Sequence, residues 1–264
     1  MTTAALASAV RYSGSLRNAT WYGHEVGDRE RFAAFLREVV RSRVSDAESG
    51  FEADLRGLAT TNMATERVEQ LLRAAQDPEG WEIGEALAEC ALQTDSGRKI
   101  DWPWNTVRDR RTPRASLPGT DLVGFCTREE GIFLVFGEVK TSSEKSTPPQ
   151  VMYGGSGMMW QLEQSAHRLD IQRTLLQWLY TRCVAGPFRD MYETAVSRFL
   201  SSGGKDLLII GVLIRDTEPN EADLQGRGEA LVSRLPSPTR IELFAWYLPV
   251  PIAEWPRLLR EQSS

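Results

Sequence analysis

Asp121, Glu138 and Lys140 are the residues of this chain whose types and spacing best suit chemistry. Asp121 begins one apolar run, and Glu138 lies near the end of the next. A short polar segment, 127–131, joins the two runs. Two β-rich runs with a short glycine-containing connection are typical of a β-hairpin.

A hairpin that turns at Glu129 and Glu130 would place Asp121 opposite Glu138, with their Cβ atoms about 5 Å apart. Lys140 follows Glu138 by two residues, so it lies on the same face of the strand. Carboxylates that close repel each other unless a cation lies between them. Oxygen ligands suit a hard divalent ion, so the motif predicts a metal site. The alternative is that these charges only mark where two strands reach solvent.

The order of apolar patterns predicts an α/β fold, in which helices flank a mixed central sheet. The expected helices cover 29–43, 64–75, 81–92, 158–182, 188–200, 221–234 and 252–261, and the expected strands cover 98–104, 121–126, 132–140, 205–214 and 240–248. Runs that are apolar on both faces belong to central strands, and 132–136 and 207–214 are such runs. A break at 77–80 divides the chain into an N-terminal region, 1–78, and a main domain, 79–264.

Two further groups of polar residues stand near the hairpin in sequence. Glu85 and Glu89 lie one turn apart on one face of the helix expected at 81–92. Four arginines precede the first strand of the hairpin, and because guanidinium groups suit phosphate contacts we predict that they bind DNA. They are Arg108, Arg110, Arg111 and Arg114. A solvated loop is the alternative for this segment.

Composition excludes several classes of protein. The formal net charge of -5 argues against a protein that coats DNA passively, although an acidic enzyme can carry a local basic track. No apolar run approaches the roughly 20 residues that span a bilayer, and the first residues lack a signal pattern. Cys90, Cys126 and Cys183 are widely spaced and expected to be buried thiols. We therefore expect a cytoplasmic protein without a membrane partner. The absence of a phosphate-binding Walker loop argues against ATP hydrolysis.

The motifs and their layout resemble the PD-(D/E)xK nuclease superfamily over about residues 81–215. Asp121 matches the motif's Asp, Glu138 its second acid and Lys140 its lysine. Thr120 stands where the motif has proline, a position that varies widely. The resemblance implies a PD-(D/E)xK, restriction-endonuclease-like core with an N-terminal helical or mixed extension.

The same resemblance implies the roles of individual residues. Asp121 and Glu138 would hold Mg²⁺ (or Mn²⁺) with the Val139 carbonyl and Glu85, an acid in the preceding helix that matches a further ligand in many members. Lys140 would orient or activate the attacking water. Whether Glu85 or Glu89 is the helix ligand stays open at this point.

Gln161, at the start of the next expected helix, suits a contact to the DNA backbone or to the attacking water. Gln164 is a weaker choice for the same role. A solvent-exposed helix residue is the alternative interpretation for both.

In its size, its layout and these motifs, the chain is also similar to the Hachiman nuclease subunits (HamA), which act in bacterial anti-phage defence. This likeness implies a DNA nuclease that forms a heteromeric complex with a superfamily 2 helicase subunit (HamB-like), which controls it. The N-terminal region and three aromatic residues, Trp102, Trp104 and Trp255, are candidates for the docking face, with core packing as the alternative.

Two other functions compete with the helicase-controlled nuclease. One is a catalytically silent adaptor that keeps the fold to bind DNA or a partner. The other is a homodimeric restriction endonuclease. The complete Asp, Glu and Lys set favours an enzyme over the adaptor.

Overall fold

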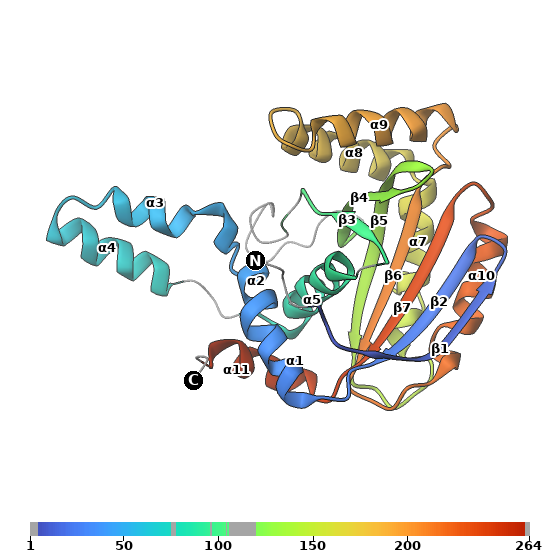
Figure 1. The fold of residues 1–264 in the computed structure, drawn as a ribbon, viewed down its shortest axis with the longest axis horizontal. Coiled ribbons are helices and arrows are strands. Elements are labelled where there is room, and N and C mark those ends of the chain that lie inside the picture. Colours follow the sequence, from blue (N-terminus) through green and yellow to red (C-terminus); the bar gives the residue numbers. More distant parts are fainter. Residues whose placement is uncertain (1–4, 75–77, 96, 104, 106–119, 262–264) are drawn as a thin grey trace.

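The computed structural model describes residues 5–74, 78–95, 97–103, 105 and 120–261. Its centre is a mixed sheet of seven strands in the order β1-β2-β7-β6-β5-β4-β3 (Figure 1). The strands are β1 (Ala9–Leu16), β2 (Ala19–Glu25), β3 (Lys99–Asp101), β4 (Leu122–Arg128), β5 (Gly131–Ser142), β6 (Leu208–Arg215) and β7 (Arg240–Tyr247). The predicted α/β class with a mixed, helix-flanked sheet is therefore confirmed.

The four strands β2, β7, β6 and β5 run parallel to one another, whereas β1, β4 and β3 join the edges in antiparallel pairs. The expected central strands are central, because β5 and β6 have paired neighbours on both sides. All eight residues of β6 are buried. Burial on both faces explains why its sequence is a continuous apolar run.

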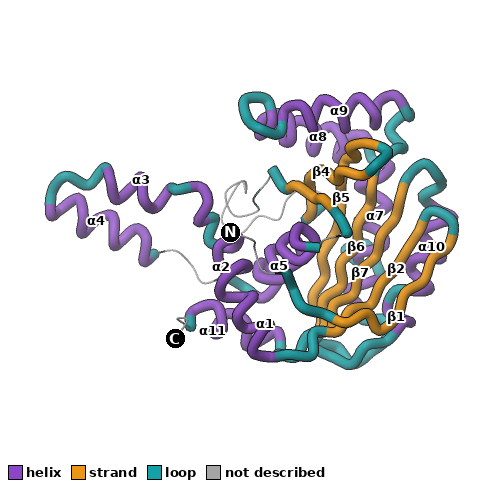
Figure 2. The backbone as a smooth tube through the Cα atoms, in the orientation of Figure 1, coloured by secondary structure: helices purple, strands orange, loops and turns teal. Residues whose placement is uncertain are grey.

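Helices cover both faces of the sheet (Figure 2). The helices of the described residues are α1 (Arg29–Phe35), α2 (Arg41–Val44), α3 (Phe51–Gly57), α4 (Asn62–Arg73), α5 (Gly80–Thr94), α7 (Met158–His167), α8 (Leu169–Cys183), α9 (Arg189–Ser201), α10 (Gln225–Arg234) and α11 (Trp255–Arg260). A π-helical segment, Leu36–Val40, continues α1 into α2. Short 3-10 turns lie at Ala47–Ser49, Gln150–Met152, Glu221–Asp223 and Ile252–Glu254.

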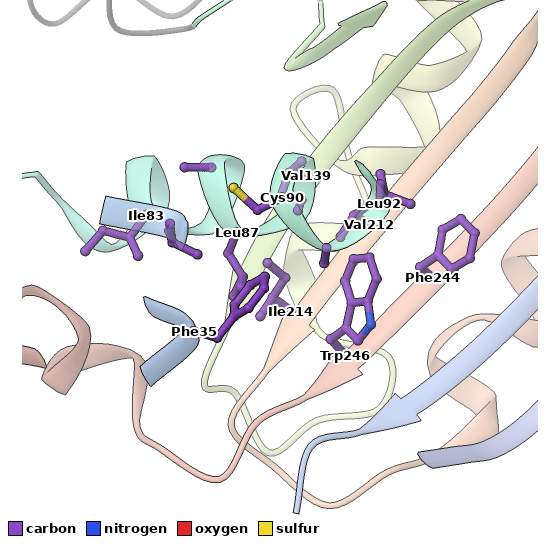
Figure 3. Close-up of a cluster of buried hydrophobic side chains, with 14 of the residues drawn as sticks. Phe35, Ile83, Leu87, Cys90, Leu92, Val139, Val212, Ile214, Phe244 and Trp246 are labelled. Atoms are coloured by element: carbon purple, nitrogen blue, oxygen red, sulfur yellow. The ribbon is translucent and has the colours of Figure 1, made fainter. Parts of the chain in front are cut away.

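One core lies between the sheet and the helices α1, α5 and α11. Figure 3 shows its centre, where Leu87 and Cys90 of α5 meet Val139, Val212 and Ile214 on the strands. A capping box begins α5, because the Glu79 side chain accepts from the N3 backbone while Glu82 reaches back to the cap. This core holds α5 across β5, next to the end of the acidic hairpin.

The second core lies on the opposite face, under α7, α8, α9 and α10. The sequence predicted one long helix over 158–182, and the chain breaks it at Arg168, whose φ of -82° and ψ of 114° are extended. The break resets the helical phase. Leu169, directly after the break, is 79% exposed, whereas Leu175 is buried.

Residues 9–25 differ most from prediction. They form the hairpin of β1 and β2, and β2 pairs with β7, so the sheet crosses the predicted boundary at residue 78. Beyond α2, the helices α3 and α4 project away from the sheet (Figure 1). The assignment of this region to partner docking stays a prediction.

The aromatic candidates for docking are buried where the structure describes them. Trp102 is 6% exposed and Trp255 is fully buried, so both pack in the core, and the docking role suggested for them is wrong. Trp104 lies outside the described residues. The three cysteines are buried free thiols, as expected. Within the described ranges, none of the helices combines the length and apolar character needed to cross a lipid bilayer.

Candidate functional site

The acidic hairpin forms with the predicted register. Val123 pairs with Phe136 and Phe125 with Leu134, and the chain turns through the two residues between Arg128 and Gly131. The predicted pairing of Asp121 with Glu138 continues this register by one step. Both acids therefore lie at the start of β4, where β5 continues past the end of their pairing.

Asp121 continues the ladder with its side chain. Its backbone N–H donates to the Gly137 carbonyl at 2.9 Å, and the Val139 N–H donates to Asp121 Oδ2 at 2.9 Å. The N–H and C=O of one strand residue point to the same side. The Val139 carbonyl, a predicted ligand, is thus directed toward the edge of β5 where Asp121 lies.

Glu138 and Lys140 form an ion pair on the face of β5 that lies under α7. Lys140 Nζ lies 2.6 Å from Glu138 Oε1, and the Glu138 side chain is only 2% exposed. The second carboxylate oxygen, Oε2, is buried and has no hydrogen-bond partner within the described residues. The pair therefore leaves one buried acceptor without a partner.

The charges of the site are not balanced by Lys140 alone. Burial raises the pKa of Glu138 well above its usual range, and the nearby Asp121 carboxylate raises it further, while Lys140 opposes both effects. Enclosure by the protein also raises the pKa of Asp121, against the Val139 hydrogen bond and Lys140. Two enclosed carboxylates beside one ammonium would be stabilised by another cation.

The two glutamates of α5 are both buried, with Glu85 8% and Glu89 2% exposed. Glu89 accepts from Arg43 Nε at 2.5 Å, and its other oxygen is buried without a hydrogen-bond partner in the described chain. Burial raises the pKa of Glu89, Arg43 lowers it, and Asp121 raises it. Glu89 is therefore within electrostatic reach of the acidic hairpin and is held by an arginine of α2.

The described residues contain no group of three or more His, Cys, Asp or Glu side chains that could hold a metal ion. Glu85 thus does not form such a group with Asp121 and Glu138, and its role as a ligand stays a prediction. Mg²⁺ is commonly held by one or two carboxylates, with water and substrate phosphate completing its shell. Asp121 and Glu138, with a buried oxygen to satisfy, fit that donor set.

Gln161 lies beside the site in the first turn of α7. The cross-strand neighbour of Glu138 is Gly211. A Cβ atom there would lie 2.9 Å from Met158 Sδ, so the glycine lets α7 approach this part of the sheet closely. Gln161 follows Met158 by three residues and shares its face. The Gln161 Oε1 atom is buried without a hydrogen-bond partner in the described part of the chain.

The structure brings together Asp121, Glu138, Lys140 and the Val139 backbone, with Gln161 on the adjoining helix. The four predicted DNA-binding arginines, Arg108, Arg110, Arg111 and Arg114, lie outside the described residues, so their role stays a prediction.

Sequence analysis missed two interactions at the site, the anchoring role of Thr120 and an ion pair of Glu89. Thr120 is 2% exposed, accepts from the Gly137 N–H at 3.1 Å and thereby anchors the residue next to Asp121. The Arg43–Glu89 ion pair was also missed, and its partners are 46 residues apart, so no local spacing signals it.

A comparison of the chain with protein-family models gave no match, and neither did a comparison with curated proteins.

Proposed function

We propose that this protein is a metal-dependent DNA nuclease of the PD-(D/E)xK type. The observation that supports the proposal most is the convergence of Asp121, Glu138 and Lys140 at one place on the sheet, with a buried Glu138 oxygen that lacks a partner. Two carboxylates and an ammonium are a donor set suited to a divalent ion and a phosphate. The complete set supports an enzyme over a silent adaptor.

Each residue of this site has a role in the proposed hydrolysis of a phosphodiester. Asp121, Glu138 and the Val139 carbonyl would hold Mg²⁺ or Mn²⁺. The bound ion would polarise a phosphate oxygen and lower the pKa of a water molecule. Lys140, kept in place by Glu138, would orient the attacking water and stabilise the charge that develops on the phosphate. Gln161 would donate its amide N–H to the DNA backbone and leave Oε1 for the water.

We further propose that the nuclease is the effector subunit of a bacterial anti-phage complex, controlled by a superfamily 2 helicase subunit. The motif likeness to Hachiman nuclease subunits supports this part of the proposal. The projecting helices α3 and α4 add a surface suited to docking, because Phe51, Leu58 and Met63 are more than 60% exposed there.

The first experiment is a plasmid-degradation assay with Mg²⁺ and with a chelator. The double variant Glu138→Ala, Lys140→Ala should abolish degradation. The control Lys145→Ala, Glu218→Ala removes the same pair of charges from two exposed residues and should cut like the wild type. Equal cutting by the wild type and the E138A/K140A variant would refute the site.

The second experiment is independent of activity, because a partner subunit could hold the isolated nuclease idle. Titration calorimetry should show one Mn²⁺ bound per wild-type chain and none per Glu138→Gln variant. Equal Mn²⁺ binding by the two proteins would contradict the assignment of Glu138 as a ligand.

A further inference from the structure

A hollow of about 410 Å³ lies at the end of the sheet opposite Asp121 and Glu138, beside the turn that joins β4 and β5. Residues of the β1–β2 turn, the end of β4, the beginning of β7 and the last turn of α9 line it. The charged residues of its wall are the arginines Arg17, Arg128, Arg198 and Arg240 and the acids Asp206 and Glu242. β5 begins beside the hollow at Gly131 and reaches Glu138 seven residues later, which is roughly 23 Å at the strand rise.

The wall has fewer acids than arginines. Glu242 accepts from Arg128 and also from Arg98, behind the wall, so one carboxylate serves two guanidinium groups. The other wall acid, Asp206, pairs with Arg198 at 2.6 Å. The wall therefore has four cationic and two anionic side chains, in a chain whose formal net charge is -5. A local cationic excess on an acidic chain attracts anions.

Two of the arginines are held in place by an aromatic ring. The guanidinium carbons of Arg198 and Arg240 lie 4.1 Å and 4.3 Å from the centroid of the Phe133 ring. Arg198 also donates to the Glu130 carbonyl at 2.8 Å, and Arg240 pairs with the Glu130 carboxylate at 3.0 Å. Stacked and hydrogen-bonded arginines have already lost side-chain freedom, so less entropy is lost when they bind a ligand.

Arg17 is the arginine of the wall whose charge is unpaired in the described chain. Its guanidinium forms no ion pair or hydrogen bond within the described residues. Its φ of 51° lies in the left-handed region, where glycine or asparagine is less strained than arginine. Asn18 fixes the turn by donating to the Leu235 and Thr239 carbonyls, each at 2.7 Å. Arg17 thus lies in a strained conformation at a rigid turn, and its side chain lines the hollow.

We propose that this hollow binds a phosphate-bearing small molecule of nucleotide size. The planar forks of arginine match the oxygens of phosphate, and the Arg17 guanidinium, unpaired within the described ranges and beside three further arginines, suits an anionic group. A volume of about 410 Å³ lies in the range of small-ligand sites. The ligand is bound at a site separate from Asp121 and Glu138 and needs no metal ion.

Titration calorimetry with EDTA present tests the proposal without metal at the acidic hairpin. Pyrophosphate and ATP should each bind the wild type at one site per chain, more weakly as salt is raised, because the contacts are ionic. ATP that binds more tightly than pyrophosphate would identify a nucleotide site, and equal affinities a site for phosphate groups alone. Adenosine, which lacks phosphate, should not bind. Absence of binding by both phosphates, or equal binding of adenosine and ATP, would overturn the proposal.

Arg17→Gln provides the decisive variant, since the side chain is exposed and lacks partners whose loss could unfold the protein. It should weaken pyrophosphate binding roughly tenfold. Arg11→Gln is the matched control, because Arg11 is on the same hairpin, pairs with Glu25 and does not line the hollow. The double variant R17Q/R240Q should bind more weakly still. Wild-type affinity in R17Q, or in the double variant where circular dichroism shows it folded, would overturn the assignment.

Discussion

The backbone N–H of Val139 donates to Oδ2 of Asp121 at 2.9 Å, so the first acid of the hairpin is tied to the strand that carries the second acid and the lysine. This hydrogen bond lies one step beyond the last backbone pair of β4 and β5. A carboxylate positioned by a strand amide needs no flexible loop to orient it. The relationship leads directly to a test that separates charge from position.

Asp121→Asn should keep the fold and lose the proposed activity. The asparagine carbonyl can still accept from Val139, but the side chain no longer carries the negative charge that holds a metal ion. We expect DNA cleavage to fall by roughly two orders of magnitude or more, with a nearly unchanged melting temperature. Asp121→Ala, by contrast, should also lower stability, because it leaves the Val139 N–H unpaired. Cleavage by D121N at the wild-type rate would exclude Asp121 from the site.

Glu85→Gln and Glu89→Gln should behave differently. Glu89 is paired with Arg43 in a buried position, so its neutralisation removes a buried ion pair and lowers thermal stability. If Glu85 is the predicted ligand, E85Q should raise the Mg²⁺ concentration needed for half-maximal cleavage and leave stability nearly unchanged. Mg²⁺ titrations and melting curves of both variants decide this, and an unchanged Mg²⁺ requirement in E85Q would remove Glu85 from the site.

Gly137→Ala should disrupt the sheet directly beside the site. A Cβ atom at Gly137 would lie 2.4 Å from the backbone oxygen of Ile210, on a central strand that cannot shift easily. We expect a loss of about 3 kcal/mol in the free energy of unfolding, measured in urea. Gly226→Ala is the control, since no atom lies within 4 Å of the added carbon, and this change in α10 should stabilise by about 0.5 kcal/mol. Similar stabilities for the two variants would contradict the close pairing of β5 and β6.

Asp223→Ala should be among the most destabilising single changes. Arg215 is 1% exposed and donates to both oxygens of Asp223 at 2.7 Å, so the variant leaves a buried cation without its partner. The expected cost is about 3–5 kcal/mol in the free energy of unfolding. Asp170→Ala breaks an exposed pair with Arg168 and should have little effect. Comparable urea midpoints for the two variants would show that the buried pair is dispensable.

His24 should make stability depend on pH in mildly acidic solution. Burial lowers the pKa of His24 and the Arg98 guanidinium lowers it further, while Asp95 raises it. Below the ordinary value of 6.5, the unfolded chain therefore binds a proton that the folded chain resists, and stability falls as the pH decreases.

His24→Phe cannot titrate, and the ring suits a site next to Tyr22, Phe244 and Trp246. Between pH 7.5 and pH 5.5 the wild type should lose more stability than this variant does. Urea unfolding at both pH values measures the difference, and equal losses would exclude His24 as the cause.

Local patterns predicted the hairpin because its determinants are local. The register of β4 and β5 follows from a two-residue turn and from the alternation of side chains, both of which are written in 20 consecutive residues. The central position of β6 followed from an apolar run, since only a strand covered on both faces can be apolar at every position.

Local sequence patterns failed to predict the structure where contacts between distant residues determine it. Most residues of β1 are exposed, so its sequence carries little apolar signal. The β1–β2 hairpin joins the sheet because β2 pairs with β7, which follows more than 200 residues later. Leu169 faces solvent because the chain breaks at Arg168, which shifts the phase of every later position. A periodic pattern continued across that break places Leu169 inward, whereas the structure has it exposed.

The sequence by itself determined which residues could do chemistry and that Asp121 would meet Glu138. Only the tertiary structure decided that Glu89 is held by Arg43, that α7 approaches Glu138 over Gly211, and that four arginines surround one hollow. The physical reason is the separation in sequence between the residues that interact. A strand register is set by neighbours two residues apart, whereas burial, ion pairing and the shape of a cavity depend on elements that meet only when the sheet and its helices have packed.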